Sequence, residues 1–210
     1  MDKLLLQGSN LCPTEPSYDL VKHLNQLKSR AKECLQFTVS VPNYLFRCFL
    51  NVQVITHPLY STNTFTNDIA LLKLASPVVF TPRISPVCLA PSTINILPGT
   101  RCFTTGWGRT AITTSPMILQ QTGLPIMSPA VCRQIWGQSR ITDAMICAGA
   151  SGSSSCHGDS GGPLVCESKG VWSLVGSVSW GTSTCSTVYP VIYARISQLR
   201  SWIDKTIASN

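Results

Sequence analysis

This sequence of 210 residues has little charge, no long apolar run and only three histidines. Charged residues make up 12% of the chain and hydrophobic residues 44%, whereas a disordered chain needs high charge and low hydrophobicity. No apolar run reaches the roughly 18 residues of a membrane-spanning helix. We therefore expect a folded chain without a membrane segment, in which three histidines restrict the possible catalytic schemes.

The net charge of +7 does not indicate nucleic-acid binding, because the basic residues are not clustered. Residues 51–210 carry only 10 Lys or Arg and 5 Asp or Glu, scattered along the segment. A nucleic-acid site needs a basic patch or stripe. We expect a mildly basic surface and no nucleic-acid partner.

Cysteine, by contrast, is abundant, and ten cysteines in a chain of this size favour disulfides and an oxidising compartment. The N-terminus, residues 1–8, has only three consecutive leucines, while a signal peptide needs an apolar stretch of about 7–15 residues. The cysteines therefore predict a secreted or extracellular protein, although the chain as written begins without an export signal.

The chain changes character near residue 50. Apolar residues recur at helical spacing between residues 17 and 33, which predicts an amphipathic helix. Residues 35–41 alternate between apolar and polar and predict a strand that ends at Pro42. From residue 51 onward, short apolar runs separated by Gly, Pro, Ser and Thr predict the many short strands of a barrel or sandwich.

One string of eleven residues, 156–166, carries the strongest signal of chemistry. It reads Cys-His-Gly-Asp-Ser-Gly-Gly-Pro-Leu-Val-Cys and flanks Ser160 with glycines. Glycines permit the backbone angles of a tight turn and let N–H groups approach a substrate carbonyl as an oxyanion hole. Ser160 is therefore a candidate nucleophile. The nucleophile elbow of α/β-hydrolases is excluded, because no histidine follows Ser160 and Gly161-Gly162-Pro163 opposes the helix that an elbow requires.

Four further strings occur in the same order and spacing as in a known family. They are Asn-Asp-Ile-Ala-Leu-Leu-Lys-Leu at 67–74, Thr-Thr-Gly-Trp-Gly at 104–108, Asp-Ala-Met-Ile-Cys-Ala-Gly at 143–149 and Val-Ser-Trp-Gly at 178–181. With the serine string, they make residues 51–210 resemble the trypsin/chymotrypsin family of serine proteases, in particular the chymotrypsin-like digestive enzymes.

This resemblance implies a role for each matching residue. Ser160 is the expected nucleophile, Asp68 the buried acid that orients a catalytic histidine, and the N–H groups of Gly158 and Ser160 the oxyanion hole. Ser154 is expected at the base of the specificity pocket, as in chymotrypsin, with Ser179, Trp180 and Gly181 along its wall. The implied disulfides are Cys102–Cys166, Cys132–Cys147 and Cys156–Cys185. The pairing of the other cysteines stays open: Cys12, Cys34, Cys48 and Cys88.

Val191 stands where the family has a glycine, in a string that reads Pro-Val-Ile-Tyr instead of Pro-Gly-Val-Tyr. The glycine keeps the pocket open for a large ring, and Val191 would add a branched side chain to the wall. We therefore expect a pocket suited to small or medium apolar side chains.

The general base is the main departure from the family. A serine hydroxyl is a poor nucleophile until an imidazole accepts its proton. The family's Ala-Ala-His-Cys string, about 45 residues before the acid, is absent here. His57 is expected in an exposed loop and His157 at the rim of the pocket. His23 has the right separation of 45 residues from Asp68, but its surroundings are helix-like and no cysteine follows it.

The activation string, Ile-Val-Gly-Gly or similar, is also absent. In the family, the new amino terminus pairs with the aspartate that precedes the serine, here Asp159. We therefore expect Asp159 to lose its partner, which is costly for a buried carboxylate.

Together these observations predict an all-β, chymotrypsin-like double β-barrel with an incomplete first barrel and a C-terminal helix. The expected divisions are an atypical segment at 1–50 and a partial protease domain at 51–210. That domain divides into the end of the first barrel (51–90), a crossing (91–102), the second barrel (103–196) and a terminal helix (197–208).

Two hypotheses of function follow, and a third alternative is a truncated or spliced product or a faulty gene model. The first is a serine endopeptidase that works through an acyl-enzyme, with His23 as the base. The second, which we favour, is a catalytically dead relative that binds peptides or inhibitors. In both cases the expected partners are protein or peptide substrates and protein protease inhibitors, and the chain is expected to be a monomer without metal or organic cofactor.

Overall fold

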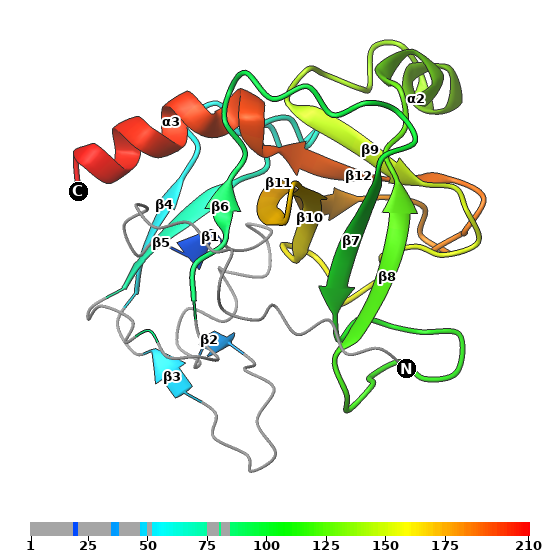
Figure 1. The fold of residues 1–210 in the computed structure, drawn as a ribbon, viewed down its shortest axis with the longest axis horizontal. Coiled ribbons are helices and arrows are strands. Elements are labelled where there is room, and N and C mark those ends of the chain that lie inside the picture. The colour runs from blue at the N-terminus through cyan, green and yellow to red at the C-terminus, as the bar shows by residue number, and fades with distance from the viewer. Residues whose placement is uncertain (1–18, 21–34, 38–46, 50–51, 75–79, 81–84) are drawn as a thin grey trace.

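The computed structural model describes residues 19–20, 35–37, 47–49, 52–74, 80 and 85–210 (Figure 1). Residues 19–20, which fall within the helix predicted for 17–33, form a strand because they pair with residues 71–72, so the prediction is wrong there. The remainder of that predicted helix, most of the strand predicted at 35–41, and the side chains of His23, Cys12 and Cys34 lie outside the described residues.

The first group of strands is small. β1 (Asp19–Leu20), β5 (Ala70–Leu74) and β4 (Val52–Thr56) form an antiparallel sheet in that order. In the β1–β5 pair, Asp19 lies opposite Leu72 and Leu20 opposite Leu71. β2 (Leu35–Phe37) pairs separately with β3 (Arg47–Phe49), in agreement with the strand predicted from residue 35.

The second group is a seven-stranded sheet that curls around one core (Figure 1). Six strands follow in the order β8-β7-β10-β11-β12-β9, all antiparallel, and the short β6 (Cys88–Leu89) pairs in parallel with β11. A bridge between Ile126, just after β8, and Ala148 in β9 joins the two outermost strands of this order. The bounds of these six strands are Arg101–Gly106 (β7), Gln120–Pro125 (β8), Met145–Gly149 (β9), Pro163–Ser168 (β10), Val171–Trp180 (β11) and Pro190–Arg195 (β12).

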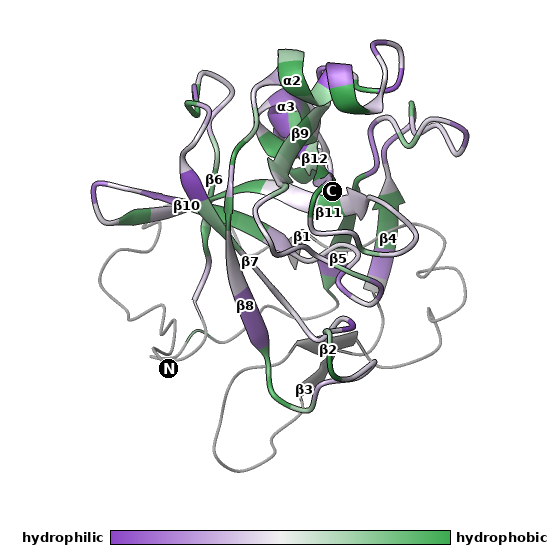
Figure 2. Ribbon diagram, turned by 90° about the vertical axis from the view of Figure 1, so that its right-hand side faces the viewer, coloured by the Kyte–Doolittle hydropathy of each residue, from purple (hydrophilic) through white to green (hydrophobic). Residues whose placement is uncertain are grey.

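The core of this sheet comes from large side chains that are almost fully buried, among them Leu124, Leu164, Val175 and Tyr193. Figure 2 shows β9 and β12 as largely hydrophobic, in line with their buried residues. It shows part of β8 as hydrophilic, in line with the exposed Gln120 and Gln121. The predicted all-β, chymotrypsin-like fold is confirmed.

Two helices complete the described fold. α3 (Ile196–Ala208) begins within a residue of the predicted terminal helix and buries Ile196, Leu199 and Ile203. α2 (Pro129–Trp136) was not predicted, although its start carries a signal. Ser128 accepts a hydrogen bond from Val131 N at 3.2 Å and Pro129 occupies the first turn, where a missing N–H costs nothing.

Three disulfides join described cysteines, and all three are pairs that the family resemblance implied: Cys102–Cys166, Cys132–Cys147 and Cys156–Cys185. Within the described ranges, neither helix is long and apolar enough to cross a lipid bilayer.

Candidate active site

The candidate nucleophile lies on a turn that hydrogen bonds fasten to β11. Gly161 N donates to Val178 O at 2.8 Å, and Val178 N donates to Gly162 O at 2.9 Å. Gly162 N donates back to Asp159 O at 2.7 Å and closes the turn around Ser160. The backbone of Val178 in β11 therefore holds the turn that carries Ser160.

Gly158 can only be a glycine here. Its φ of +100° lies in the region that side chains rarely adopt, and a Cβ would lie 3.0 Å from Gly108 Cα. Neither Gly158 N nor Ser160 N donates to an acceptor among the described residues. Both N–H groups are therefore available as donors beside the serine hydroxyl, and an oxyanion hole needs such donors.

The expectation that Asp159 lacks a partner is wrong. Its Oδ1 accepts from Gly108 N at 2.8 Å and its Oδ2 from Cys156 N at 2.9 Å. The carboxylate fills space that Gly106 and Gly108 leave, because a Cβ at either residue would come within 2.5 Å of it. Backbone donors distant in sequence satisfy the carboxylate, so a reading of the local sequence could not reveal them.

Asp68 is buried, with 7% of its surface exposed, and its Oδ2 accepts from Ser179 Oγ at 2.6 Å. Ser179 directly follows Val178, which holds the Ser160 turn. Adjacent residues of β11 therefore fasten the candidate acid and the candidate nucleophile. Burial, and secondly the negative charge of Asp68, raise the pKa of Tyr60.

The candidate pocket lies between the loop before the serine and β12. Ser154 Oγ donates to Ser155 O at 2.9 Å, and Ser155 Oγ lies 2.9 Å from the Tyr193 hydroxyl. Burial raises the pKa of Tyr193 to about 12. Val191 is 5% exposed, and its Cγ2 lies 3.8 Å from the point where a Cβ of Gly181 would be. The Val191 side chain therefore faces Gly181.

Sequence reasoning missed a cluster of side chains beside Trp180. The Trp136 ring lies 5.0 Å from the Trp180 ring and 5.8 Å from that of Tyr189. The Arg140 guanidinium lies 5.0 Å from the Trp180 ring centre, a cation–π distance. These residues come from α2 and from two loops, so only the tertiary structure brings them together.

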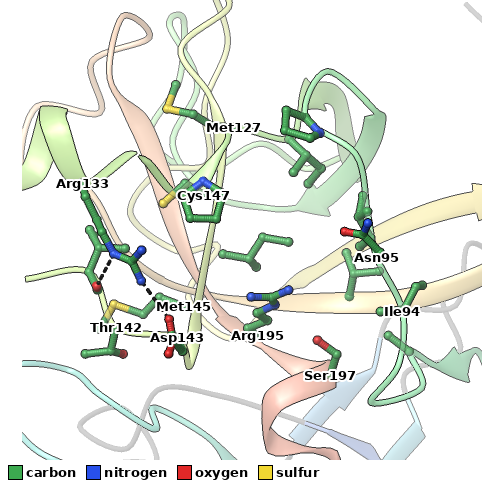
Figure 3. Close-up of a pocket in the computed structure, with 18 residues that line it drawn as sticks. Ile94, Asn95, Met127, Arg133, Thr142, Asp143, Met145, Cys147, Arg195 and Ser197 are labelled. Atoms are coloured by element: carbon green, nitrogen blue, oxygen red, sulfur yellow. Dashed lines mark hydrogen bonds and ion pairs between the residues drawn. The ribbon is translucent and has the colours of Figure 1, made fainter. Parts of the chain in front are cut away.

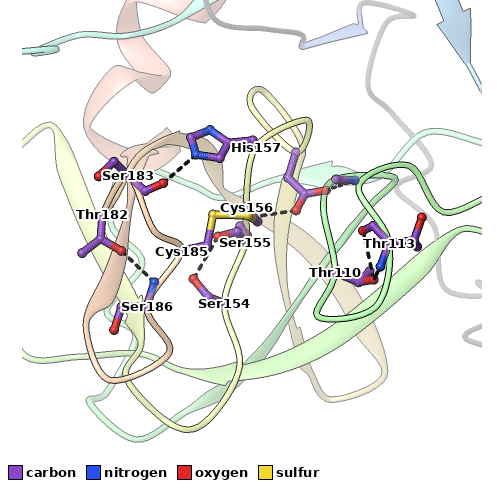
Figure 4. Close-up of a disulfide and its surroundings, with 12 residues drawn as sticks. Thr110, Thr113, Ser154, Ser155, Cys156, His157, Thr182, Ser183, Cys185 and Ser186 are labelled. Carbon is purple, nitrogen blue, oxygen red and sulfur yellow. Dashed lines mark hydrogen bonds between the residues drawn. A yellow bond between two sulfur atoms is a disulfide. The ribbon is translucent and has the colours of Figure 1, made fainter.

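The two described histidines both have contacts that differ from those of a general base. His157 is exposed and its Nε2 lies 2.8 Å from Ser183 O, beside the Cys156–Cys185 disulfide (Figure 4). The His57 ring lies 4.8 Å from that of Trp202 in α3, and its Nδ1 accepts from Leu59 N. Burial lowers the pKa of His57. His57 lies in a loop, as expected, but it is half-buried instead of exposed because its ring packs against Trp202 of the terminal helix.

No described residue forms a hydrogen bond with the Ser160 hydroxyl. The described residues also contain no group of three His, Cys, Asp or Glu side chains that would hold a metal ion. The described part of the site therefore contains a candidate nucleophile, a candidate acid and backbone N–H donors.

Comparison with known proteins agrees with this geometry. The model of the Trypsin family matches residues 45–203. Transmembrane protease serine 9 of Rattus norvegicus is 42% identical over 163 residues, which cover 75% of this chain and 15% of that protein. The chain thus spans a small part of the length of this relative. With a curled antiparallel sheet, a terminal helix and a match over most of its length, the chain belongs to the trypsin family of serine proteases.

Proposed function

We propose that this trypsin-family chain binds polypeptides at the Ser160 turn and does not hydrolyse them efficiently. One observation carries the proposal: the described residues supply a serine, an acid and backbone N–H donors, but the imidazoles of His57 and His157 contact Trp202 and Ser183 instead of Ser160. A serine protease site that lacks one member of its triad retains only about 10³–10⁴-fold catalysis over water.

The retained parts suit peptide binding. In an active relative, the serine oxygen attacks the substrate carbonyl, the base accepts its proton, and the oxyanion accepts hydrogen bonds from two N–H groups. Without a base the first step stalls, but Gly158 N and Ser160 N are still available to a carbonyl oxygen. The backbone bonds of Asp159 to Gly108 and Cys156 support this arrangement without an inserted amino terminus.

An active endopeptidase with His23 as the base is the second candidate, and the register of β1 favours it. Leu20, three residues before His23, pairs with Leu71, three residues after Asp68. Because this pairing is antiparallel, the C-terminal end of β1 and the N-terminal end of β5 lie at the same end of the sheet. That end would be the place for a histidine that Asp68 orients.

Labelling with a fluorophosphonate decides between the two candidates, because the reagent reacts only with an activated serine. For the first candidate we expect wild type to label no faster than Ser160→Ala. Rapid labelling at Ser160 would overturn this proposal. If His23→Gln then abolished the labelling while His157→Gln did not, the second candidate would be correct.

The pocket is proposed to accept small or medium apolar side chains, because Val191 faces Gly181. Peptides that end in Ala, Val, Leu or Phe test this, with binding measured by calorimetry. We expect the Phe peptide to bind at least about tenfold more weakly than the Val peptide, since overfilling a packed site costs about 1–3 kcal/mol. Val191→Gly is expected to reverse the preference, and equal binding of all four peptides by wild type would contradict the proposal.

We also infer that the chain functions as a secreted monomer whose partners are polypeptide substrates and protein protease inhibitors. Family membership and three disulfides support a location outside the cytosol. We further propose that residues 1–50 form a segment distinct from the protease domain at 51–210.

A further inference from the structure

A cavity of about 120 Å³ lies away from the Ser160 turn, and no residue of that turn lines it. Its walls come from the crossing segment before β7, from α2 with the loop that follows it, from β9 and from the start of α3 (Figure 3). Apolar side chains form part of the lining, including Ile94, Ile126 and Val175. Its charged lining residues are Arg133, Asp143 and Arg195.

Two of these three charges neutralise each other. The Arg133 guanidinium donates to Asp143 Oδ1 at 2.8 Å and to Ile141 O at 3.2 Å. The guanidinium of Arg195 has no acceptor among the described residues. The cavity therefore carries one positive charge in excess, on a half-buried side chain with five N–H donors.

The N-terminus of α3 adds further donors at the same place. Arg195 is its N-cap and provides no side-chain cap, and the first turn contains no acidic residue. The first N–H groups of a helix need acceptors, and the helix dipole favours negative charge there. Ser197, in this turn, lines the cavity and is only 6% exposed, and its hydroxyl has no partner among the described residues. Figure 3 shows the Ser197 oxygen directed toward the side of the cavity where Arg195 lies.

From this arrangement we propose that the cavity binds a small carboxylate with an apolar body. One excess cation matches a monoanion, and a guanidinium accommodates a carboxylate with two parallel hydrogen bonds. The Ser197 hydroxyl donates to the same group, and the apolar body packs against Ile126 and Val175. An apolar cavity of about 150 Å³ accommodates benzene, so this partly open pocket suits an apolar body of at most one ring, with the carboxylate at Arg195.

Benzoate is the probe, and benzamide, which has the same shape without the charge, is the matched control. Binding to the full chain is measured by thermal unfolding and by NMR of the ligand. We expect benzoate to bind and to raise the Tm, and benzamide and inorganic phosphate to bind at least about tenfold more weakly, because a charge-assisted hydrogen bond contributes about 1.5–3 kcal/mol. N-acetylvaline represents the carboxylate of a polypeptide C-terminus and is expected to bind more weakly than benzoate. Tighter binding of N-acetylvaline would overturn the small-molecule assignment.

Arg195→Gln is expected to weaken benzoate binding at least about tenfold. Lys169→Gln, which removes one positive charge at an exposed turn, is expected to leave it unchanged. Ser197→Ala is the second variant and is expected to weaken benzoate binding several-fold. It serves as the test of the proposal if near-UV circular dichroism shows that Arg195→Gln does not fold. Equal binding of benzoate and benzamide, or unchanged binding by the folded variants, would refute the proposal.

Discussion

The two parts of the molecule differ in how much of the site each one supports. The part from β7 onward has six strands of the large sheet, three disulfides and both described helices. It positions Ser160, the N–H groups of Gly158 and Ser160, and the candidate pocket. Of the described strands before it, β1 to β5 form small sheets and only β6 joins the large one. Asp68, which the Ser179 hydroxyl contacts, comes from this first part. Under the proposed function, we therefore expect peptide binding to depend mainly on the second part, whereas proton transfer would also need Asp68 from the first.

The contact between Asp68 and Ser179 joins residues 111 positions apart. A second link is the packing of His57, just after β4, on Trp202 of α3. We therefore expect changes in the second part to lower both the free energy of unfolding and peptide binding. Changes in the first part should have small effects on the free energy of unfolding. Four variants test this contrast.

The largest expected decrease in the free energy of unfolding comes from Cys102→Ala/Cys166→Ala, which removes the Cys102–Cys166 disulfide. The two cysteines are 64 residues apart, and closing a loop of this length restricts the unfolded chain by about 4 kcal/mol. The matched control is Cys132→Ala/Cys147→Ala, with a separation of 15 residues and an expected loss of about 3 kcal/mol. Urea unfolding measures both. A larger loss from the shorter loop would contradict the prediction.

Asp159→Asn should have the next largest effect. The amide oxygen can accept from only one of Gly108 N and Cys156 N, because the NH₂ group then faces the other donor. Leaving one donor unsatisfied should cost about 1–3 kcal/mol of unfolding free energy and weaken peptide binding at the Ser160 turn. Asp143→Asn removes an exposed ion pair with Arg133 and should cost at most about 1 kcal/mol. Equal losses would mean that the Asp159 contacts do not support the turn.

Alkaline pH should destabilise the second part through Tyr193. Burial raises its pKa to about 12, above the ordinary value of 10, so the unfolded chain releases the phenolic proton first. The protonated Tyr193 therefore contributes fully to the free energy of unfolding below about pH 10. This contribution is lost as the pH rises toward 12, and the free energy of unfolding falls by about 2 kcal/mol. Urea unfolding of wild type and Tyr193→Phe across this range measures it. A variant with the same slope as wild type would show that another group is responsible.

The smallest expected effect comes from His57, in the first part. Because burial lowers its pKa below 6.5, the unfolded chain binds the proton first as the pH falls. The free energy of unfolding should therefore decrease slightly below about pH 6.5 in wild type, and less in His57→Gln. The measurement is urea unfolding at pH 7 and pH 5. A large decrease that His57→Gln removes would show that the first part contributes more to stability than the comparison implies.

Sequence reasoning succeeded where the signal was local. Short apolar runs separated by turn residues predicted the strands, and helical spacing predicted α3 from residue 197. It missed α2, although Ser128 as the N-cap and Pro129 in the first turn are a recognisable signal for the start of a helix. It was wrong about Asp159, because the donors are backbone N–H groups at Gly108 and Cys156 that no side-chain pattern marks.

The sequence by itself determined the family, the strand-rich fold and the candidate nucleophile, since these follow from strings of neighbouring residues. Only the tertiary structure decided that Asp159 is satisfied, that His57 packs on Trp202 and that Val191 faces Gly181. It also placed Arg195, whose guanidinium has no acceptor among the described residues, beside Ser197 in one pocket. The physical reason is that hydrogen bonds and burial depend on distances between atoms that folding brings together, and those distances are not encoded at any single position of the chain.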